Sequence, residues 1–178
     1  MKIGHIISAT PTEFIATLDP EQAVGLYEFV AIDGVEPTPE GPKPVRVLGQ
    51  IVKIYRDPYQ LKRDLPLYSV VEQVAQDLLE VQAAKVKVLG YLSDGEVHTP
   101  KMPPRVGSPV YLAEDREVEE LYGRGELCVG KLMPRGIDAC LDLEGLKRHV
   151  AVIAATGSGK TWFSVVLIEE LLKQGAEC

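Results

Sequence analysis

The 178-residue chain lacks several features that mark particular protein classes. Its three cysteines, Cys128, Cys140 and Cys178, are too few and too scattered for a disulfide framework or a Cys-x-x-Cys metal site, so we expect reduced thiols and a cytoplasmic protein. No apolar run approaches the about 18 residues of a membrane span. The first residues, MKIGHIISATPTEF, lack the basic flank, apolar core and cleavage site of a signal peptide.

The chain also lacks an excess of positive charge. Its 19 Lys and Arg against 26 Asp and Glu give a formal net charge of -7. Residues 131–178 contain six residues of each sign, so the whole excess lies in residues 1–130. Neutralising nucleic-acid phosphates needs clustered Lys and Arg, and we therefore expect no broad nucleic-acid footprint on that first stretch. The hydrophobic and charged fractions, 46% and 25%, are near globular averages and exclude disorder and coiled coil.

Residues 1–135 are predicted to form a mainly β domain. Short runs rich in Ile, Val and aromatic residues alternate with turn-prone segments, and the prolines and glycines of Pro37–Pro44 predict a loop. Apolar residues at three- and four-residue spacing predict an amphipathic helix at 66–80, and an acidic helix is expected near 114–122. Many short strands with inserted helices favour a small β-barrel or closed sandwich. The expected strands are Lys2–Ala9, Glu13–Leu18, Tyr27–Ile32, Val45–Tyr55, Ala84–Leu92 and Leu127–Met133.

Residues 136–178 have a different character. Val150–Ala155 is a continuous run of small and β-branched residues, typical of a strand covered on both faces in a parallel sheet. The apolar segment Lys160–Gln174 predicts a helix packed on such a sheet, with Gly175 as its C-cap. We interpret this part as the first strand, loop and helix of an α/β domain.

One motif carries chemistry. Ala154-Ala155-Thr156-Gly157-Ser158-Gly159-Lys160-Thr161 matches the phosphate-binding P-loop at every position but the first, where Ala154 replaces glycine. Glycines let successive N–H groups turn toward phosphate oxygens, and the helix N-terminus adds its positive end. We predict that Lys160 contacts the β- and γ-phosphates of ATP as the catalytic cation and that the Thr161 hydroxyl is a Mg²⁺ ligand. The nucleotide-binding residues are then Thr156, Gly157, Ser158, Gly159, Lys160 and Thr161.

Other interpretations of this loop are weaker. A Gly-rich turn without nucleotide is disfavoured by the strand-loop-helix context, and a dinucleotide site is disfavoured because Trp162 stands where a third glycine is required. Only 18 residues follow Lys160, too few for the other carboxylates and arginine of a complete ATPase site. We therefore expect weak ATP affinity and no hydrolysis from residues 1–178 alone.

The sequence resembles the HerA group of DNA translocases, which are related to FtsK-type pumps. The resemblance runs from KIGHIISATPTEF through PPRVGSPVYLAEDREVEELY and CVGKL to KRHVAVIAATGSGKTW. It implies a barrel like that at the front of rotary ATP synthase subunits, followed by a RecA-like ATPase domain. It also implies hexameric rings that thread double-stranded DNA, and a NurA-type nuclease that docks on the barrel face in end resection and recombinational repair.

Two alternatives stay open at this point. The chain could be an assembly module without catalytic activity, or a rotary ATP synthase-type subunit, although the helix at 66–80 and the approach to the loop disfavour the latter. Trp162 departs from the small polar residue usual in the family, and packing in the core or against a subunit is favoured over base stacking.

The remaining polar residues favour structural roles. No carboxylate or cysteine stands at ligand spacing from any histidine, although a subunit-interface role for His149 stays open. A solvated helix face is favoured for the acidic run, and solvated surface for the two basic pairs. These residues are His5, His98 and His149; Glu114, Asp115, Glu117, Glu119 and Glu120; and Lys62-Arg63 and Lys147-Arg148.

Overall fold

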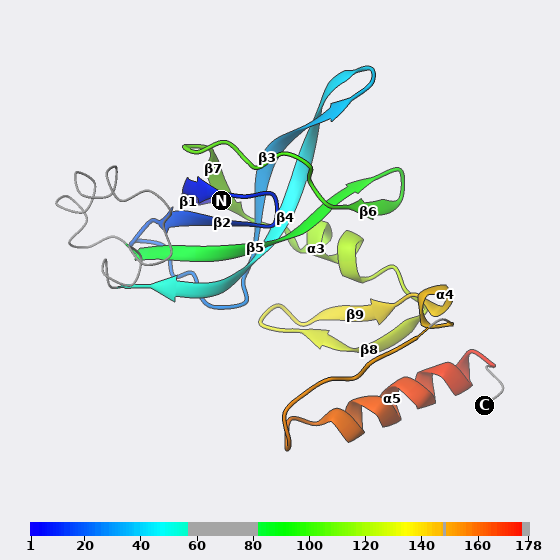
Figure 1. Cartoon of the computed structure of the whole chain (residues 1–178). Coiled ribbons are helices and arrows are strands. Elements are labelled where there is room, and N and C mark those ends of the chain that lie inside the picture. The colour runs from blue at the N-terminus through cyan, green and yellow to red at the C-terminus, as the bar shows by residue number, and fades with distance from the viewer. Residues whose placement is uncertain (57–81, 148, 176–178) are drawn as a thin grey trace. The chain divides into compact units, whose positions relative to one another are not determined.

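The computed structural model describes residues 1–56, 82–147 and 149–175. Two compact units, Met1–Ala113 and Glu114–Cys178, divide the chain, and each is described by itself (Figure 1). The predicted domains, 1–135 and 136–178, rest on the character of the sequence rather than on contacts, and their boundary stays a prediction.

The first unit is a closed barrel of antiparallel strands. Its sheet has the order β2-β1-β7-β3-β4-β5-β6, and β2 also pairs with β5, so six of the described strands form a closed ring (Figure 1). Closure pairs edges that would otherwise be open to other chains. The predicted β-barrel is thereby confirmed. Its strands are β1 (Lys2–Ala9), β2 (Glu13–Leu18), β3 (Phe29–Thr38), β4 (Gly41–Tyr55), β5 (Gln82–Ser93) and β7 (Pro109–Leu112), with β6 (Glu96–His98) extending the sheet beyond β5.

The barrel core follows from alternation along the strands. Phe14, Ala16 and Leu18 of β2 point inward, while Ile15 between them packs in a second cluster with Tyr55 and Ala83. On β5 the buried Val86 likewise alternates with Lys85, which pairs with Glu13 at 2.9 Å. The main cluster comprises Ile3, Ile6, Phe14, Ala16, Leu18, Val30, Ile32, Val47, Ile51, Ala84, Val86 and Val110.

The proline-rich segment is not the predicted loop. Strands β3 and β4 stay paired through it, with Val35 opposite Pro44 and Pro37 opposite Pro42, as far as a turn between Thr38 and Gly41. Proline has no N–H, but alternate pairs of an antiparallel ladder need no N–H toward the partner strand. Pro37, Pro42 and Pro44 all fall on one alternate set of pairs in this register, which is the arrangement that such a ladder tolerates.

The other predicted elements are largely found. Strands β1 and β2 have the predicted bounds, and the acidic helix is present as α3 (Asp115–Tyr122). The helix predicted at 66–80 lies outside the described residues. The sequence interpretation missed β6, β7 and the later strand β9, each of five residues or fewer.

The second unit has a small core. It contains α3, the hairpin of β8 (Leu127–Leu132) and β9 (Ile137–Leu141), the one-turn α4 (Leu143–Leu146) and α5 (Lys160–Lys173). Helix α5 packs against β8, and α3 packs against β9. Within its described residues, the buried apolar side chains are Val118, Leu127, Ile137 and Leu167.

The predicted strand at 150–155 is not formed. These residues make no strand pairing in the described structure, and Val150 and Ile153 expose 49% and 90% of their surface. A central strand of a parallel sheet needs neighbours that supply hydrogen bonds and cover its faces. No described segment does so here, although the helix that follows forms as predicted and Gly175 adopts the left-handed φ of 77° expected at its C-terminus.

The prediction of reduced cysteines is wrong for two of the three. Cys128 on β8 lies opposite Cys140 on β9, and the two form a disulfide with their Cα atoms 4.0 Å apart. Two residues 12 positions apart are brought together because β8 and β9 pair as a hairpin. The pairing could not be inferred without β9.

Candidate nucleotide-binding loop

The six predicted nucleotide-binding residues form one continuous turn and helix start. Gly157 and Gly159 have φ values of 81° and 90°, which side chains other than glycine adopt only at a cost. Between them, the Ser158 hydroxyl donates to the Ala155 carbonyl at 2.7 Å and its backbone N–H donates to the same oxygen at 3.3 Å. This turn leads directly into Gly159, which is the N-cap of α5.

The Lys160 ammonium group folds back across the turn. Its Nζ donates to the Ala154 carbonyl at 2.7 Å, six residues earlier, and the side chain is partly buried although the preceding loop residues are exposed. The Ala154 carbonyl, a neutral acceptor, therefore holds the Lys160 ammonium group against the turn. An anion there would compete with the Ala154 carbonyl for the ammonium group.

The start of α5 supplies further donors. The first helical hydrogen bond is from the Phe163 N–H to the Gly159 carbonyl at 2.9 Å, so the N–H groups of Lys160, Thr161 and Trp162 precede the ladder and have no acceptor within it. No acidic residue stands in the first turn. The positive end of the helix dipole is thus available to an anion.

Thr161 and Trp162 are both at the surface of the helix start. Thr161 is exposed, beside Lys160 in the first turn, so its hydroxyl is accessible to a metal ion held by phosphates. Trp162 is 73% exposed, and the interpretation of Trp162 as a core residue is wrong for this unit. Packing against another subunit stays a prediction.

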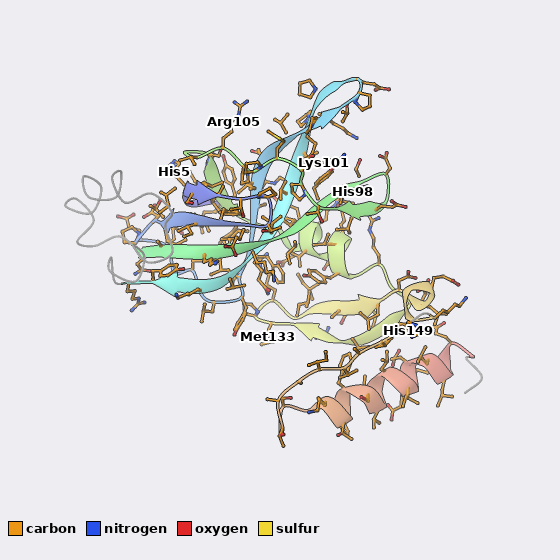
Figure 2. The ribbon with its side chains drawn as sticks, viewed as in Figure 1. His5, His98, Lys101, Arg105, Met133 and His149 are labelled. Carbon is orange, nitrogen blue, oxygen red and sulfur yellow. A yellow bond between two sulfur atoms is a disulfide. The ribbon has the colours of Figure 1, made fainter. Side chains whose placement is uncertain are left out.

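The three histidines lie on separate segments of the two units. In the barrel unit, His5 lies on β1, and its backbone N–H and carbonyl exchange hydrogen bonds with the Thr17 hydroxyl. The ring of His98 lies 5.6 Å from the ring of Tyr91 in a tilted arrangement. Figure 2 labels all three histidines. His149 is exposed in the other unit. Among the described residues, no group of three His, Cys, Asp or Glu side chains is arranged to hold a metal ion.

The acidic run lies on α3 and at its N-cap with exposed or partly buried side chains, in line with the predicted solvated helix face. Glu114 and Glu117 form a capping box at the start of α3, with the Glu114 N–H donating to Glu117 Oε2 at 2.7 Å. Asp115 pairs with Arg135 at 3.0 Å. These carboxylates cap and anchor α3.

One of the two basic pairs can be followed in part. Lys147 forms an ion pair with Glu144 on α4. Its neighbour Arg148 and the pair Lys62-Arg63 lie outside the described residues.

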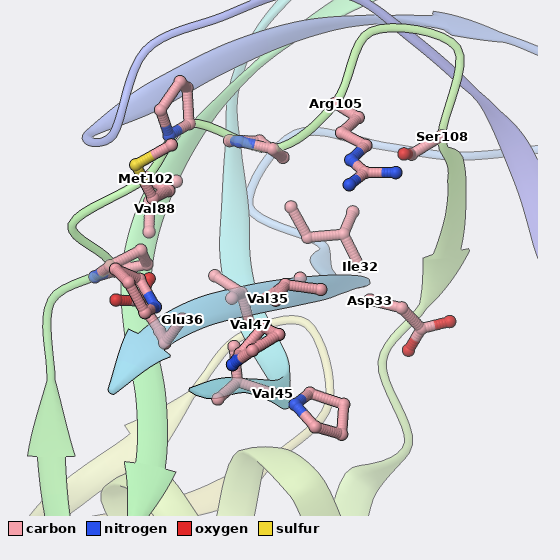
Figure 3. Close-up of a pocket in the computed structure, with 17 residues that line it drawn as sticks. Ile32, Asp33, Val35, Glu36, Val45, Val47, Val88, Met102, Arg105 and Ser108 are labelled. Carbon is pink, nitrogen blue, oxygen red and sulfur yellow. The ribbon is translucent and has the colours of Figure 1, made fainter. Parts of the chain in front are cut away.

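A groove of about 560 Å³ lies beside the β3–β4 hairpin of the barrel unit (Figure 3). Its wall is mainly valine, proline and Met102. Its carboxylates already have partners, since Asp33 pairs with Arg46 at 2.7 Å and the buried Glu36 accepts the Lys101 N–H at 3.0 Å. The groove is apolar, and its lining suggests packing rather than acid-base chemistry.

Within the ranges that the structure describes, no helix is both long and apolar enough to cross a bilayer.

Comparison with known proteins gives the same order of parts. Residues 3–94 match the family model of the HAS barrel domain. Residues 127–178 match the central domain of the helicase HerA. The second match includes the whole loop from Ala154 to Thr161.

Curated relatives match nearly the whole chain. A protein named DNA double-strand break repair helicase HerA from Sulfolobus acidocaldarius is 33% identical over 98% of this chain and 34% of its own length. Proteins of the same name from Sulfurisphaera tokodaii and Saccharolobus solfataricus are 30% and 28% identical, over 96% and 98% of this chain. The chain thus spans about a third of the length of these relatives.

Proposed function

The chain belongs to the HAS-barrel family, and from this premise we propose that it is the N-terminal part of an ATP-dependent DNA translocase of the HerA type. The observation that carries the proposal is the loop Thr156–Thr161, in which two left-handed glycines lead into α5 and Lys160 folds over the turn. The predicted resemblance to HerA proteins is confirmed by the two family matches and by the curated relatives.

The loop fits the triphosphate of ATP. Its donors are the partly buried Lys160 ammonium group and the N–H groups at the start of α5, and all favour an anion. On binding, Lys160 leaves the Ala154 carbonyl for phosphate oxygens, while the glycines keep the backbone close to them. The Thr161 hydroxyl would supply one oxygen ligand for Mg²⁺, which would neutralise charge on the phosphates.

The proposed roles of the barrel are assembly and docking. It assembles the homo-hexameric ring and docks a NurA-type nuclease, while double-stranded DNA is held mainly by the ATPase region beyond these residues. The negative charge of residues 1–130 supports this division, because an acidic surface repels phosphate. The relatives are named as DNA double-strand break repair helicases, which supports a role in DNA repair. The proposed role within repair is end resection and recombinational repair in the cytoplasm.

An assembly module without catalysis is the second candidate. The closed ring of barrel strands favours it, since Met1–Ala113 has its own core and needs no strand from the other unit. The two proposals differ only in whether the loop binds and turns over ATP.

Lys160→Ala in the full-length protein tests the choice. The proposal expects ATP turnover to be lost while ring formation and nuclease binding, measured by sizing chromatography with light scattering, are retained. The matched control is Lys173→Ala at the other end of α5, where the ammonium group is exposed and pairs with Glu170. Turnover that survives Lys160→Ala would exclude this loop as the nucleotide site, whereas a wild-type protein without turnover would leave the assembly module.

A further inference from the structure

The disulfide of the second unit is accessible to solvent. Cys128 is exposed and Cys140 is partly buried, so a small thiol reaches the Cys128 sulfur more readily. Cys128 follows the buried Leu127 at the start of β8, and Cys140 is the next-to-last residue of β9. The disulfide therefore links the two strands near the open end of their hairpin, far from the turn that already connects them.

The hairpin held by this bond supports the P-loop helix. Helix α5 packs on β8, and the Gln174 side chain donates to the Glu126 carbonyl at 3.2 Å, just before β8 begins. Among the described residues, β8 and β9 form a sheet of two strands only. Isolated two-stranded hairpins are marginally stable, and this one has little core to support it.

We propose that Cys128–Cys140 is a thiol–disulfide exchange site whose state sets the stability of the hairpin on which α5 packs. A dithiol is the reducing partner. Its first thiolate attacks the Cys128 sulfur, and the Cys140 thiolate leaves as the bond breaks. The second thiolate of the reagent then displaces Cys128, so the protein gains two electrons and two protons and the reagent becomes a disulfide.

Reduction loosens the hairpin because the open chain gains conformational freedom. A disulfide between residues 12 positions apart shifts a folding equilibrium by about 100-fold toward the folded state. Amides that exchange by opening of the hairpin therefore exchange about 100-fold faster once the bond is reduced. The barrel unit has its own core and does not respond.

Peptide mapping tests the bond itself. The 178-residue protein is equilibrated with oxidised glutathione, quenched in acid, alkylated and digested without reductant. The expected product is a peptide pair linked through Cys128 and Cys140, which separates after dithiothreitol. Cys178→Ala is the control, because it removes the remaining thiol and leaves the pair. Alkylation or glutathione adducts at both Cys128 and Cys140 without reductant would overturn the proposal.

Hydrogen exchange read by mass spectrometry tests the consequence. Wild-type protein with and without dithiothreitol, and the double variant Cys128→Ala/Cys140→Ala, are compared with Cys178→Ala. Faster exchange is expected at 127–141 and along α5 in the reduced protein and the double variant, with β3 and β4 unchanged. Equal exchange in the oxidised and reduced wild type would overturn the proposal, whether or not the double variant folds. No nucleotide enters either measurement, so the result is independent of the proposed function.

Discussion

A methyl group added at Gly159 tests whether the left-handed backbone of the loop serves nucleotide binding. Gly159 has a φ of 90° as the N-cap of α5, and a Cβ built there meets no atom within 4 Å. Gly159→Ala therefore adds no steric clash within the described part of the chain, and its effect on the unliganded loop comes from the backbone.

The size of the effect follows from that geometry. A left-handed conformation costs a residue other than glycine about 1–2 kcal/mol. If ATP binds only the native loop, that cost lowers its affinity by about 5- to 30-fold. Asparagine tolerates the left-handed region better, so Gly159→Asn should lose less affinity than Gly159→Ala.

The assay is fluorescence anisotropy of an ATP analogue carrying a fluorophore on the ribose, titrated with the 178-residue protein. Gly130→Ala is the matched control, since Gly130 is in the same unit, has open space around its Cβ and has no left-handed φ. The expected order of affinity is wild type and Gly130→Ala, then Gly159→Asn, then Gly159→Ala. Wild-type affinity in Gly159→Ala would refute the reasoning.

Three further outcomes concern stability. Gly4→Ala should prevent barrel folding, because its Cβ would lie 1.7 Å from the Thr17 carbonyl oxygen; a cooperative urea transition like that of the wild type would contradict the strand packing. Asp115→Asn breaks the partly exposed pair with Arg135 and should cost at most about 1 kcal/mol, less in high salt; a larger, salt-independent loss in urea unfolding would contradict this. Burial raises the pKa of Tyr122 above its ordinary 10.0, so the folded state keeps a proton that the unfolded chain loses. Stability should therefore fall as pH rises above 10.0, and Tyr122→Phe should flatten that fall in urea titrations.

Local composition was sufficient for the first two barrel strands. Lys2–Ala9 and Glu13–Leu18 are rich in apolar residues and bounded by turn-prone segments, and their predicted bounds are those of β1 and β2. The short β7 was missed because four residues carry too little pattern, and its place between β1 and β3 depends on long-range pairing. The proline-rich hairpin was not predicted, because the preferences of single residues do not show which backbone N–H groups must donate to the partner strand.

The candidate loop was predictable because its chemistry is contiguous. Glycine spacing, Lys160 and the apolar helix that follows are all local, and the turn and helix are found at those residues. The strand predicted at 150–155 failed because its apolar pattern requires neighbours that the described residues do not supply. The Cys128–Cys140 bond was not predicted, because it depends on the pairing of β8 with β9, and β9 was not predicted either.

Binding of ATP to Lys160→Ala tests the central claim most directly. Equilibrium titration of the 178-residue protein with the fluorescent ATP analogue should give saturable binding that unlabelled ATP displaces. Lys160→Ala should weaken it by about 10-fold or more, as expected for loss of a charge-assisted contact of about 1.5–3 kcal/mol, while Lys173→Ala leaves it unchanged. Equal affinity in wild type and Lys160→Ala would contradict the assignment of this loop as the nucleotide site.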